Sequence, residues 1–196
     1  EYLLNLIAQK IQLPAVKSQR AFVSKSTAHG TGKTSLFHFM RALLGFENCL
    51  FELNLKKLHQ TFNAYQAGKL LIWVDDIDQA SSKQTGELKA RITADQFSYE
   101  GKGTKPITLR DSAEIWMTSN CETPLYTETE DRRQLVIECS DAWMRKGGRA
   151  LFNELYAAFA DSEIMKAWFE FLAARDLTNF SCRPECDPKK WRMGKE

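Results

Sequence analysis

The chain has 196 residues, a length that suits one domain with at most a small appendage. A formal net charge of +2 excludes strong nonspecific attraction of the whole surface to nucleic acid, so any such contact has to come from local lysines. No apolar run approaches the ~18 residues that a membrane span needs, and no signal peptide is visible. Because the five cysteines have no regular spacing, we expect an intracellular protein in a reducing compartment, without a membrane partner.

The first predicted elements are a helix and a strand. Apolar residues at helical spacing predict a helix over residues 2–12, which ends before Pro14. Residues 21–24 form a short apolar strand, which leads into a glycine-bearing turn and then a helix-like segment. The sequence of that turn is His29-Gly30-Thr31-Gly32-Lys33-Thr34-Ser35. A strand, a glycine-rich turn and a helix in this order are the layout of a phosphate-binding loop.

In such a loop each residue type has a task. Backbone N–H groups wrap the phosphates, and the helix N-terminus adds partial positive charge. Lys33 would meet the β- and γ-phosphates, and the Thr34 hydroxyl would hold Mg²⁺. The nucleotide-binding residues predicted in this way are Gly30, Thr31, Gly32, Lys33, Thr34 and Ser35. Thr27 stands where the full motif has a glycine, and the competing interpretation is a glycine-rich turn with a chance lysine.

A second group of elements follows this loop. An apolar stripe over residues 36–44 predicts a helix that ends at Gly45, and residues 49–53 form a predicted strand. We expect residues 55–66 to be helical, with Leu58 and Phe62 facing inward. The continuous apolar run over residues 70–74 predicts a strand that is buried on both faces of a parallel sheet.

Three acids follow that buried strand directly. In doubly wound sheets, ligands bind at the carboxyl ends of the strands. A carboxylate that is buried there costs free energy, so its presence indicates a function. We therefore expect Asp75 to associate with Mg²⁺ and Asp76 to orient and polarise an attacking water. Asp78 is better suited to be the N-cap of the next helix, which we expect over residues 82–92.

A hairpin is predicted next. Two alternating segments, residues 95–100 and 106–109, flank a glycine-rich turn that carries Lys102 and Lys105. A projecting turn with two lysines suits contact with a phosphate backbone. Lysines kept for solubility on a solvated loop explain this stretch equally well.

Polar residues also flank the last two predicted strands. Residues 113–118 precede Asn120, whose amide could bond a γ-phosphate or position a water, or cap its own backbone. Arg132 and Arg133 precede a strand over residues 134–139. These arginines could pair with Asp131 or reach a phosphate on a neighbouring subunit. From residue 149 onward, apolar spacing predicts two helices.

The five strands define the sheet of an α/β ATPase. If the strand before Asn120 lies between those before Lys33 and Asp75, all three groups converge on one γ-phosphate, in the strand order of the AAA+ class. The set Gly-Thr-Gly-Lys-Thr, Leu-Ile-Trp-Val-Asp-Asp, the lysine hairpin, Trp-Met-Thr-Ser-Asn and Asp-Arg-Arg resembles superfamily 3 helicases of viruses and mobile elements. The likeness is greatest to the helicase half of poxvirus-type primase–helicases and their phage and plasmid relatives, and it covers roughly residues 20–140.

This resemblance implies an AAA+-type P-loop three-layer fold with a mainly parallel five-stranded sheet, a pore hairpin and C-terminal helices. Residues 1–147 would be the ATPase core and residues 148–196 a helical extension and tail. Such proteins form rings, usually hexamers, which bind ATP and Mg²⁺ between subunits and move along single-stranded DNA through a central pore. Arg133 would be the finger that the neighbouring subunit supplies, with Arg132 the second candidate, and Lys102 and Lys105 would lie in the pore hairpin.

The expected function is therefore an ATP-dependent DNA helicase or translocase for the replication of a virus or mobile element. A primase or origin-binding domain upstream would fit, and the site of action would be the bacterial cytoplasm, or the cytoplasm or nucleus of a host cell. Asp76 stands where many relatives have glutamate. Two alternatives stay open: a nucleotide-gated DNA-binding or assembly module without hydrolysis, and a P-loop kinase acting on a small molecule.

Overall fold

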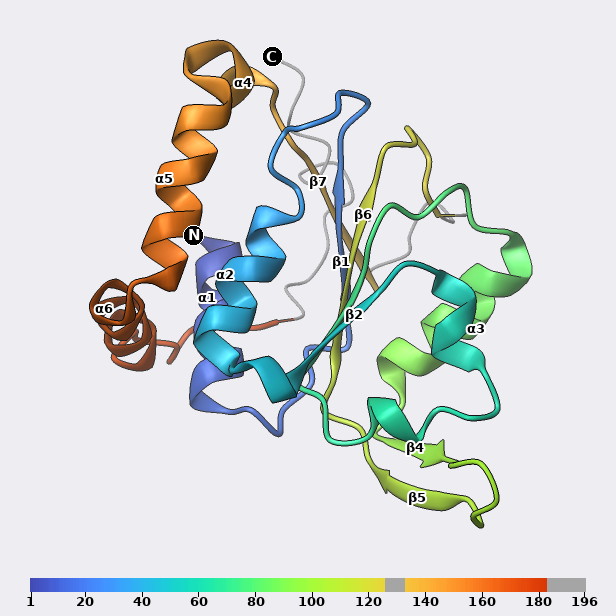
Figure 1. The fold of residues 1–196 in the computed structure, drawn as a ribbon. Coiled ribbons are helices and arrows are strands. Elements are labelled where there is room, and N and C mark those ends of the chain that lie inside the picture. The colour runs from blue at the N-terminus through green and yellow to red at the C-terminus, as the bar shows by residue number, and fades with distance from the viewer. Residues whose placement is uncertain (126–132, 183–196) are drawn as a thin grey trace.

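The computed structural model describes residues 1–125 and 133–182, which form three layers with a parallel sheet in the middle (Figure 1). The sheet has five strands in the order β2-β3-β6-β1-β7, and every neighbouring pair is parallel. The strands are β1 (Ala21–Lys25), β2 (Cys49–Glu52), β3 (Leu71–Val74), β6 (Glu114–Ser119) and β7 (Gln134–Glu138). All residues of β3 and β6 are buried, as expected of central strands covered on both faces.

Helices cover both faces of the sheet. On one face lie α1 (Tyr2–Gln12), α2 (Ser35–Leu44), α5 (Gly148–Ala160) and α6 (Ser162–Ala173). Their apolar sides meet Phe22, Trp73 and Trp116 of the sheet in one core. The other face is covered by α3 (Ser82–Thr93) and by the 3-10 turn η2 (Leu55–His59). The short helix α4 (Ala142–Lys146) follows β7.

A two-stranded hairpin projects from the end of the sheet at which the parallel strands begin (Figure 1). Its antiparallel strands are β4 (Gln96–Tyr99) and β5 (Ile107–Arg110). The base of the hairpin is fixed by the buried carboxylate of Asp111, which lies 2.7 Å from the Lys17 Nζ and 3.0 Å from the Arg91 Nε. The Arg91 guanidinium also lies 3.2 Å from the centroid of the Phe97 ring, so the network joins α3, the hairpin and the segment before β1.

Most predicted elements are confirmed, including the position of β6 between β1 and β3. The helix predicted over residues 55–66 is wrong: this segment forms η2 and the separate turn η3 (Ala64–Gln66). Leu58 is buried as expected, but Phe62 is 53% exposed, because Asn63 binds the hairpin instead of continuing a helix.

The N-cap assigned to Asp78 is also wrong. Helix α3 begins later, at Ser82, because Ser81 and Gln84 form a capping box. The Ser81 Oγ accepts from the Gln84 N–H at 3.2 Å, and the Gln84 Oε1 accepts from the Ser81 N–H at 3.0 Å. Sequence reasoning also missed α4, which is too short to show a helical period. Within residues 1–125 and 133–182, every helix is too short or too polar to cross a lipid bilayer.

Candidate nucleotide-binding site

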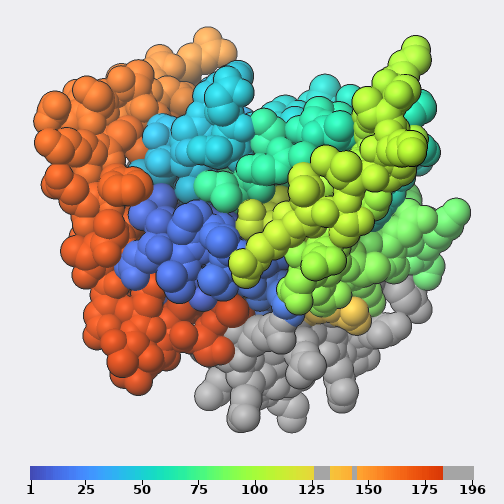
Figure 2. Space-filling view, turned by 90° about the horizontal axis from the view of Figure 1, so that it is seen from below, coloured from blue at the N-terminus to red at the C-terminus, as the bar shows by residue number. Residues whose placement is uncertain are grey.

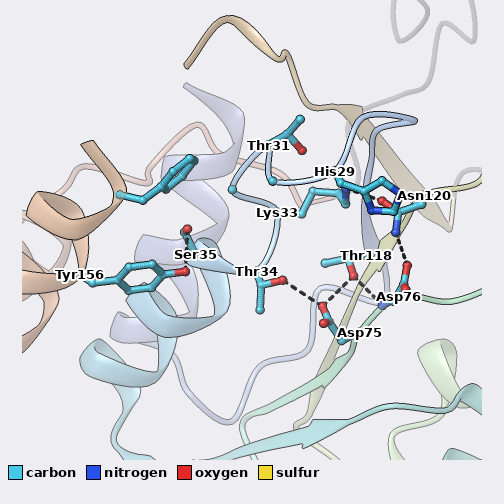
Figure 3. Close-up of a pocket in the computed structure, with 13 residues that line it drawn as sticks. His29, Thr31, Lys33, Thr34, Ser35, Asp75, Asp76, Thr118, Asn120 and Tyr156 are labelled. Carbon is cyan, nitrogen blue, oxygen red and sulfur yellow. Dashed lines mark hydrogen bonds between the residues drawn. The ribbon is translucent and has the colours of Figure 1, made fainter. Parts of the chain in front are cut away.

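A cavity of about 360 Å³ lies at the carboxyl ends of β1, β3 and β6 (Figure 3). Its walls come from the loop after β1, from the ends of β3 and β6, and from α5. Gly30 and Gly32 in the loop have φ angles of 71° and 83°, which L side chains rarely adopt. All six residues of the predicted phosphate loop, from Gly30 to Ser35, line this cavity.

Lys33 is held by uncharged oxygens. Its Nζ donates to the Asn120 Oδ1 at 2.8 Å and to the carbonyls of Ala28 and Ser26 at 3.4 and 3.5 Å. Since none of these acceptors carries a full negative charge, they orient the ammonium without neutralising it. The arrangement suits an anion that enters the cavity. The buried Thr31 Oγ1, which has no hydrogen-bond partner among the described residues, offers a further polar contact.

Asp75 lies beside the hydroxyl of Thr34, the residue that directly precedes α2. Its Oδ1 accepts hydrogen bonds from the Thr34 Oγ1 at 3.2 Å, the Thr118 Oγ1 at 2.8 Å and the Trp73 Nε1 at 3.2 Å. A hydroxyl and a carboxylate side by side fit Mg²⁺, which commonly takes one or two protein oxygens together with substrate phosphates. Thr34 and Asp75 are therefore the residues here that could hold this ion.

Asp76 has a φ of 50°, an uncommon left-handed conformation for a residue other than glycine. Two contacts maintain it: the Asp76 N–H donates to the Thr118 Oγ1 at 2.7 Å, and the Asn120 Nδ2 donates to the Asp76 Oδ1 at 2.5 Å (Figure 3). A rare backbone conformation held by surrounding contacts is a feature of functional sites. Thr118 thus contacts both acids. Because side chains two positions apart on a strand point to the same face, the spacing between Thr118 and Asn120 could have indicated this position.

Helix α5 supplies a wall that sequence reasoning missed. The Tyr156 hydroxyl lies 3.1 Å from the Ser35 Oγ, and both Phe152 and Tyr156 line the cavity. A Cβ added to Gly32 would lie 2.6 Å from the Cε1 of Phe152, so this ring rests directly on the phosphate loop. No signal in the sequence separates these aromatics from an ordinary apolar helix stripe. His29 also lines the cavity and was not predicted to do so.

The structure does not bring every predicted residue to this cavity. Arg133 directly precedes β7. Its carbonyl accepts a hydrogen bond from the Ala21 N–H at 2.8 Å, at the start of β1 and so at the end of the sheet opposite the cavity. Arg132 lies outside the described residues. Lys102 and Lys105 are exposed in the turn of the hairpin, which also lies at the end of the sheet opposite the cavity. Thr27 is exposed, and the loop that follows it has a phosphate-loop shape without the glycine of the full motif.

Residues 25–133 match the model of a family of unknown function, DUF5906. The chain belongs to this family. A comparison of the DUF5906 chain with curated protein sequences gives no match.

Solved structures with a similar fold identify the architecture. The apo structure of the NrS-1 C-terminal region superposes with a TM-score of 0.78 at 21% identity, over 96% of this chain and 45% of that one. An inhibitor-bound JCV helicase gives a TM-score of 0.52 at 13% identity, over 96% of this chain and 54% of that one. The DUF5906 chain thus spans about half the length of these solved chains. Their similarity shows that the chain has the same AAA+-type P-loop α/β fold as these structures, which confirms the predicted fold class.

Proposed function

We propose that this chain is the ATPase core of a DNA helicase or translocase that serves the replication of a virus or mobile element. One observation carries the proposal: Lys33, the Thr34–Asp75 pair and the Asp76–Asn120 pair face one cavity, from three different strand ends. This is the set of groups that in-line phosphoryl transfer to water requires. As part of the proposal we retain the core of residues 1–147 and the extension of residues 148–196.

The chemistry follows from these contacts. The triphosphate of ATP lies along the backbone N–H groups of residues 30–35, and Lys33 exchanges its amide partner for phosphate oxygens. Thr34 and Asp75 would hold Mg²⁺, which would supply positive charge against the phosphates. Asp76 and Asn120 orient the attacking water. As the water oxygen bonds to the γ-phosphorus, the bond from that phosphorus to the β–γ bridging oxygen breaks, ADP leaves, and Asp76 takes a proton from the water.

The position of Arg133 supports a ring. Arg133 lies at the end of the sheet where the strands begin, away from the cavity of its own chain. Any contact that it makes with a transferred phosphate therefore has to be made to a neighbouring subunit. We propose a homo-oligomeric ring, most simply a hexamer, in which Arg133, or Arg132 beside it, acts as the finger in trans. Arg133→Ala should retain ATP binding and lose hydrolysis, and mixing it with Lys33→Ala protein should restore some turnover.

The hairpin supplies the contact to DNA in this proposal. Lys102 and Lys105 would grip the backbone of single-stranded DNA in the pore without reading its sequence. The fold shared with the NrS-1 C-terminal region and with JCV helicase supports this assignment, and a primase or origin-binding domain would fit upstream.

One experiment separates this proposal from its alternatives. ATP hydrolysis is measured with and without single-stranded DNA, and the mass of the particle is measured with and without ATP. A motor should hydrolyse ATP faster with DNA and assemble with nucleotide. DNA-independent phosphorylation of a small molecule by a monomer would indicate a kinase, and assembly or DNA binding without hydrolysis would indicate a nonhydrolysing module.

A further inference from the structure

Two tryptophans of the central strands lie in the same core but differ in what their indole N–H groups contact. Trp73 on β3 is 0% exposed and Trp116 on β6 is 1% exposed, and their ring centroids lie 6.3 Å apart. The Trp73 Nε1 donates to the Asp75 Oδ1 at 3.2 Å. The buried Trp116 Nε1 has no hydrogen-bond partner among the described residues. This pair of residues therefore separates the effect of a buried ring from the effect of its N–H group.

Trp73 reaches Asp75 from inside the core. Because the two residues are two positions apart at the end of β3, their side chains point to the same face of the sheet, the one that α2 covers. Figure 2 shows the end of the sheet opposite the cavity, across which side chains of α1 (blue) and of the hairpin (yellow-green) lie. The indole is thus shielded from solvent, and a hydrogen bond to a carboxylate is strong in such surroundings.

Trp73 also contacts the helix that follows Thr34. The ring centroids of Trp73 and Phe37 lie 5.6 Å apart, and the Phe37 N–H donates to the Thr34 carbonyl at 3.0 Å in the first turn of α2. One side chain therefore packs against both halves of the proposed ion site. It contacts the end of β3 through Asp75 and the start of α2 through Phe37, so it helps to set the distance between Thr34 and Asp75.

The two oxygens of the Asp75 carboxylate have different surroundings (Figure 3). The three side-chain hydrogen bonds that described residues donate to this carboxylate come from Trp73, Thr34 and Thr118, and all of them go to Oδ1. Thr34 gives its hydroxyl hydrogen to Oδ1 and keeps its lone pairs for an ion. With Oδ1 occupied by three donors, Oδ2 is the oxygen that Asp75 can offer to a cation.

We propose that Trp73 is a positioning residue that makes the ion site selective for Mg²⁺ over Ca²⁺. By occupying Oδ1, its N–H group leaves the carboxylate with one oxygen for the ion. Mg²⁺ accepts single oxygens in an octahedral shell, whereas Ca²⁺ takes about 6–8 oxygens and binds carboxylates with one oxygen or with both. The inference rests on the proposed function, since it requires a nucleotide and a divalent cation in the cavity, and it names a residue that determines which cation is preferred.

The test measures the affinity of a fluorescent, non-hydrolysable ATP analogue by anisotropy in Mg²⁺, in Ca²⁺ and in EDTA. In Trp73→Phe the affinity in Mg²⁺ should fall at least about tenfold, as is typical when a residue that orients a metal ligand is lost. The affinity in Ca²⁺ should fall less, because the released Oδ1 lets Asp75 bind Ca²⁺ with both oxygens. The affinity in EDTA should stay unchanged, whereas general damage to the cavity would lower it.

Two further chains separate the N–H group from the packing of the core. Trp116→Phe removes the same atoms from the same core, so it should lower the melting temperature by a similar amount and keep the preference for Mg²⁺. Replacement of Trp73 by β-(3-benzothienyl)alanine keeps the shape of the ring and exchanges the N–H group for sulfur. That chain should lose the preference for Mg²⁺ with a smaller fall in melting temperature than Trp73→Phe.

Three results would overturn the role of Trp73. They are a parental preference for Mg²⁺ in Trp73→Phe, the same preference in the benzothienylalanine chain, and an equal loss of preference in Trp116→Phe. Because the titrations need no hydrolysis, any of these results in a chain that still binds the nucleotide would overturn this inference alone. Failure of the parent chain to bind the nucleotide in Mg²⁺ would overturn the proposed function as well.

Discussion

The Lys33 ammonium donates a hydrogen bond of 2.8 Å to the Asn120 Oδ1, across a sequence separation of 87. The other end of the same carboxamide donates to the Asp76 Oδ1 at 2.5 Å. Asn120 therefore stands between a cation and an acid that arrive from different strands, and its position on β6, between β1 and β3, makes this possible. The relationship joins Lys33, Asn120 and Asp76, the groups that we propose act on a terminal phosphate, in one chain of contacts.

The first prediction concerns the charge of Asp76. Asparagine tolerates the left-handed backbone at this position, so Asp76→Asn removes the charge and leaves the loop intact. We expect ATP hydrolysis to fall by about 10²–10⁴-fold, since a positioned base contributes that much, while nucleotide affinity changes little. Steady-state phosphate release and a titration with a fluorescent nucleotide measure the two effects. Asp78→Asn, in a neighbouring exposed acid outside the cavity, is the control, and equal activity in both variants would contradict the role of Asp76.

The second prediction concerns the packing of α5 on the phosphate loop. Gly32→Ala meets two obstacles, a φ of 83° and a Phe152 ring atom 2.6 Å from the new Cβ, so nucleotide affinity should fall at least about tenfold. Adding Phe152→Ala removes only the second obstacle and should restore part of the affinity. Gly86→Ala in α3, where a Cβ meets nothing within 4 Å, should instead stabilise the fold by about 0.5–1 kcal/mol. Full nucleotide binding by Gly32→Ala would show that the loop does not use this conformation.

The third prediction concerns the carboxylate at the base of the hairpin. Asp111 is buried with Lys17 and Arg91, so Asp111→Asn leaves two buried cations without their acid. Breaking a buried pair in this way costs about 3–5 kcal/mol of unfolding free energy, which urea denaturation measures. Glu87→Gln, which breaks the exposed pair with Lys83, should cost about 0.5 kcal/mol or less. Similar losses in the two variants would contradict the anchoring role of Asp111.

Sequence patterns predicted much of this fold because each strand of the parallel sheet contains a run of three or four apolar residues. The runs at β3 and β6 end in polar groups, which was enough to predict where the strands would converge. The segment around Phe62 could not be predicted, because its conformation depends on Asn63 binding a hairpin distant in sequence. Phe152 and Tyr156 were missed for a similar reason: a helix stripe does not show whether it covers a sheet or a ligand cavity.

The fourth prediction concerns pH. Burial lowers the pKa of both His38 and His59 below the usual value of 6.5. The unfolded chain therefore binds more protons than the folded one around and below that value, so stability is complete above about pH 6.5 and is lost as the pH falls towards the folded pKa values. The urea midpoint of unfolding should decrease as the pH is lowered from 8 to 5. The midpoint should depend less on pH in the variant His38→Gln/His59→Gln. An unchanged dependence in that variant would show that these two histidines do not cause it.

The most direct test of the central claim is ATP turnover by Lys33→Ala, measured beside the parent chain and Lys25→Ala. Lys25 ends β1 just before the loop, but its Nζ donates to the Glu122 carbonyl and it does not line the cavity. Our account predicts that turnover is lost in Lys33→Ala at an unchanged melting temperature and kept in Lys25→Ala. Turnover by Lys33→Ala at the rate of the parent chain would contradict it, because the phosphates would then be bound and cleaved elsewhere.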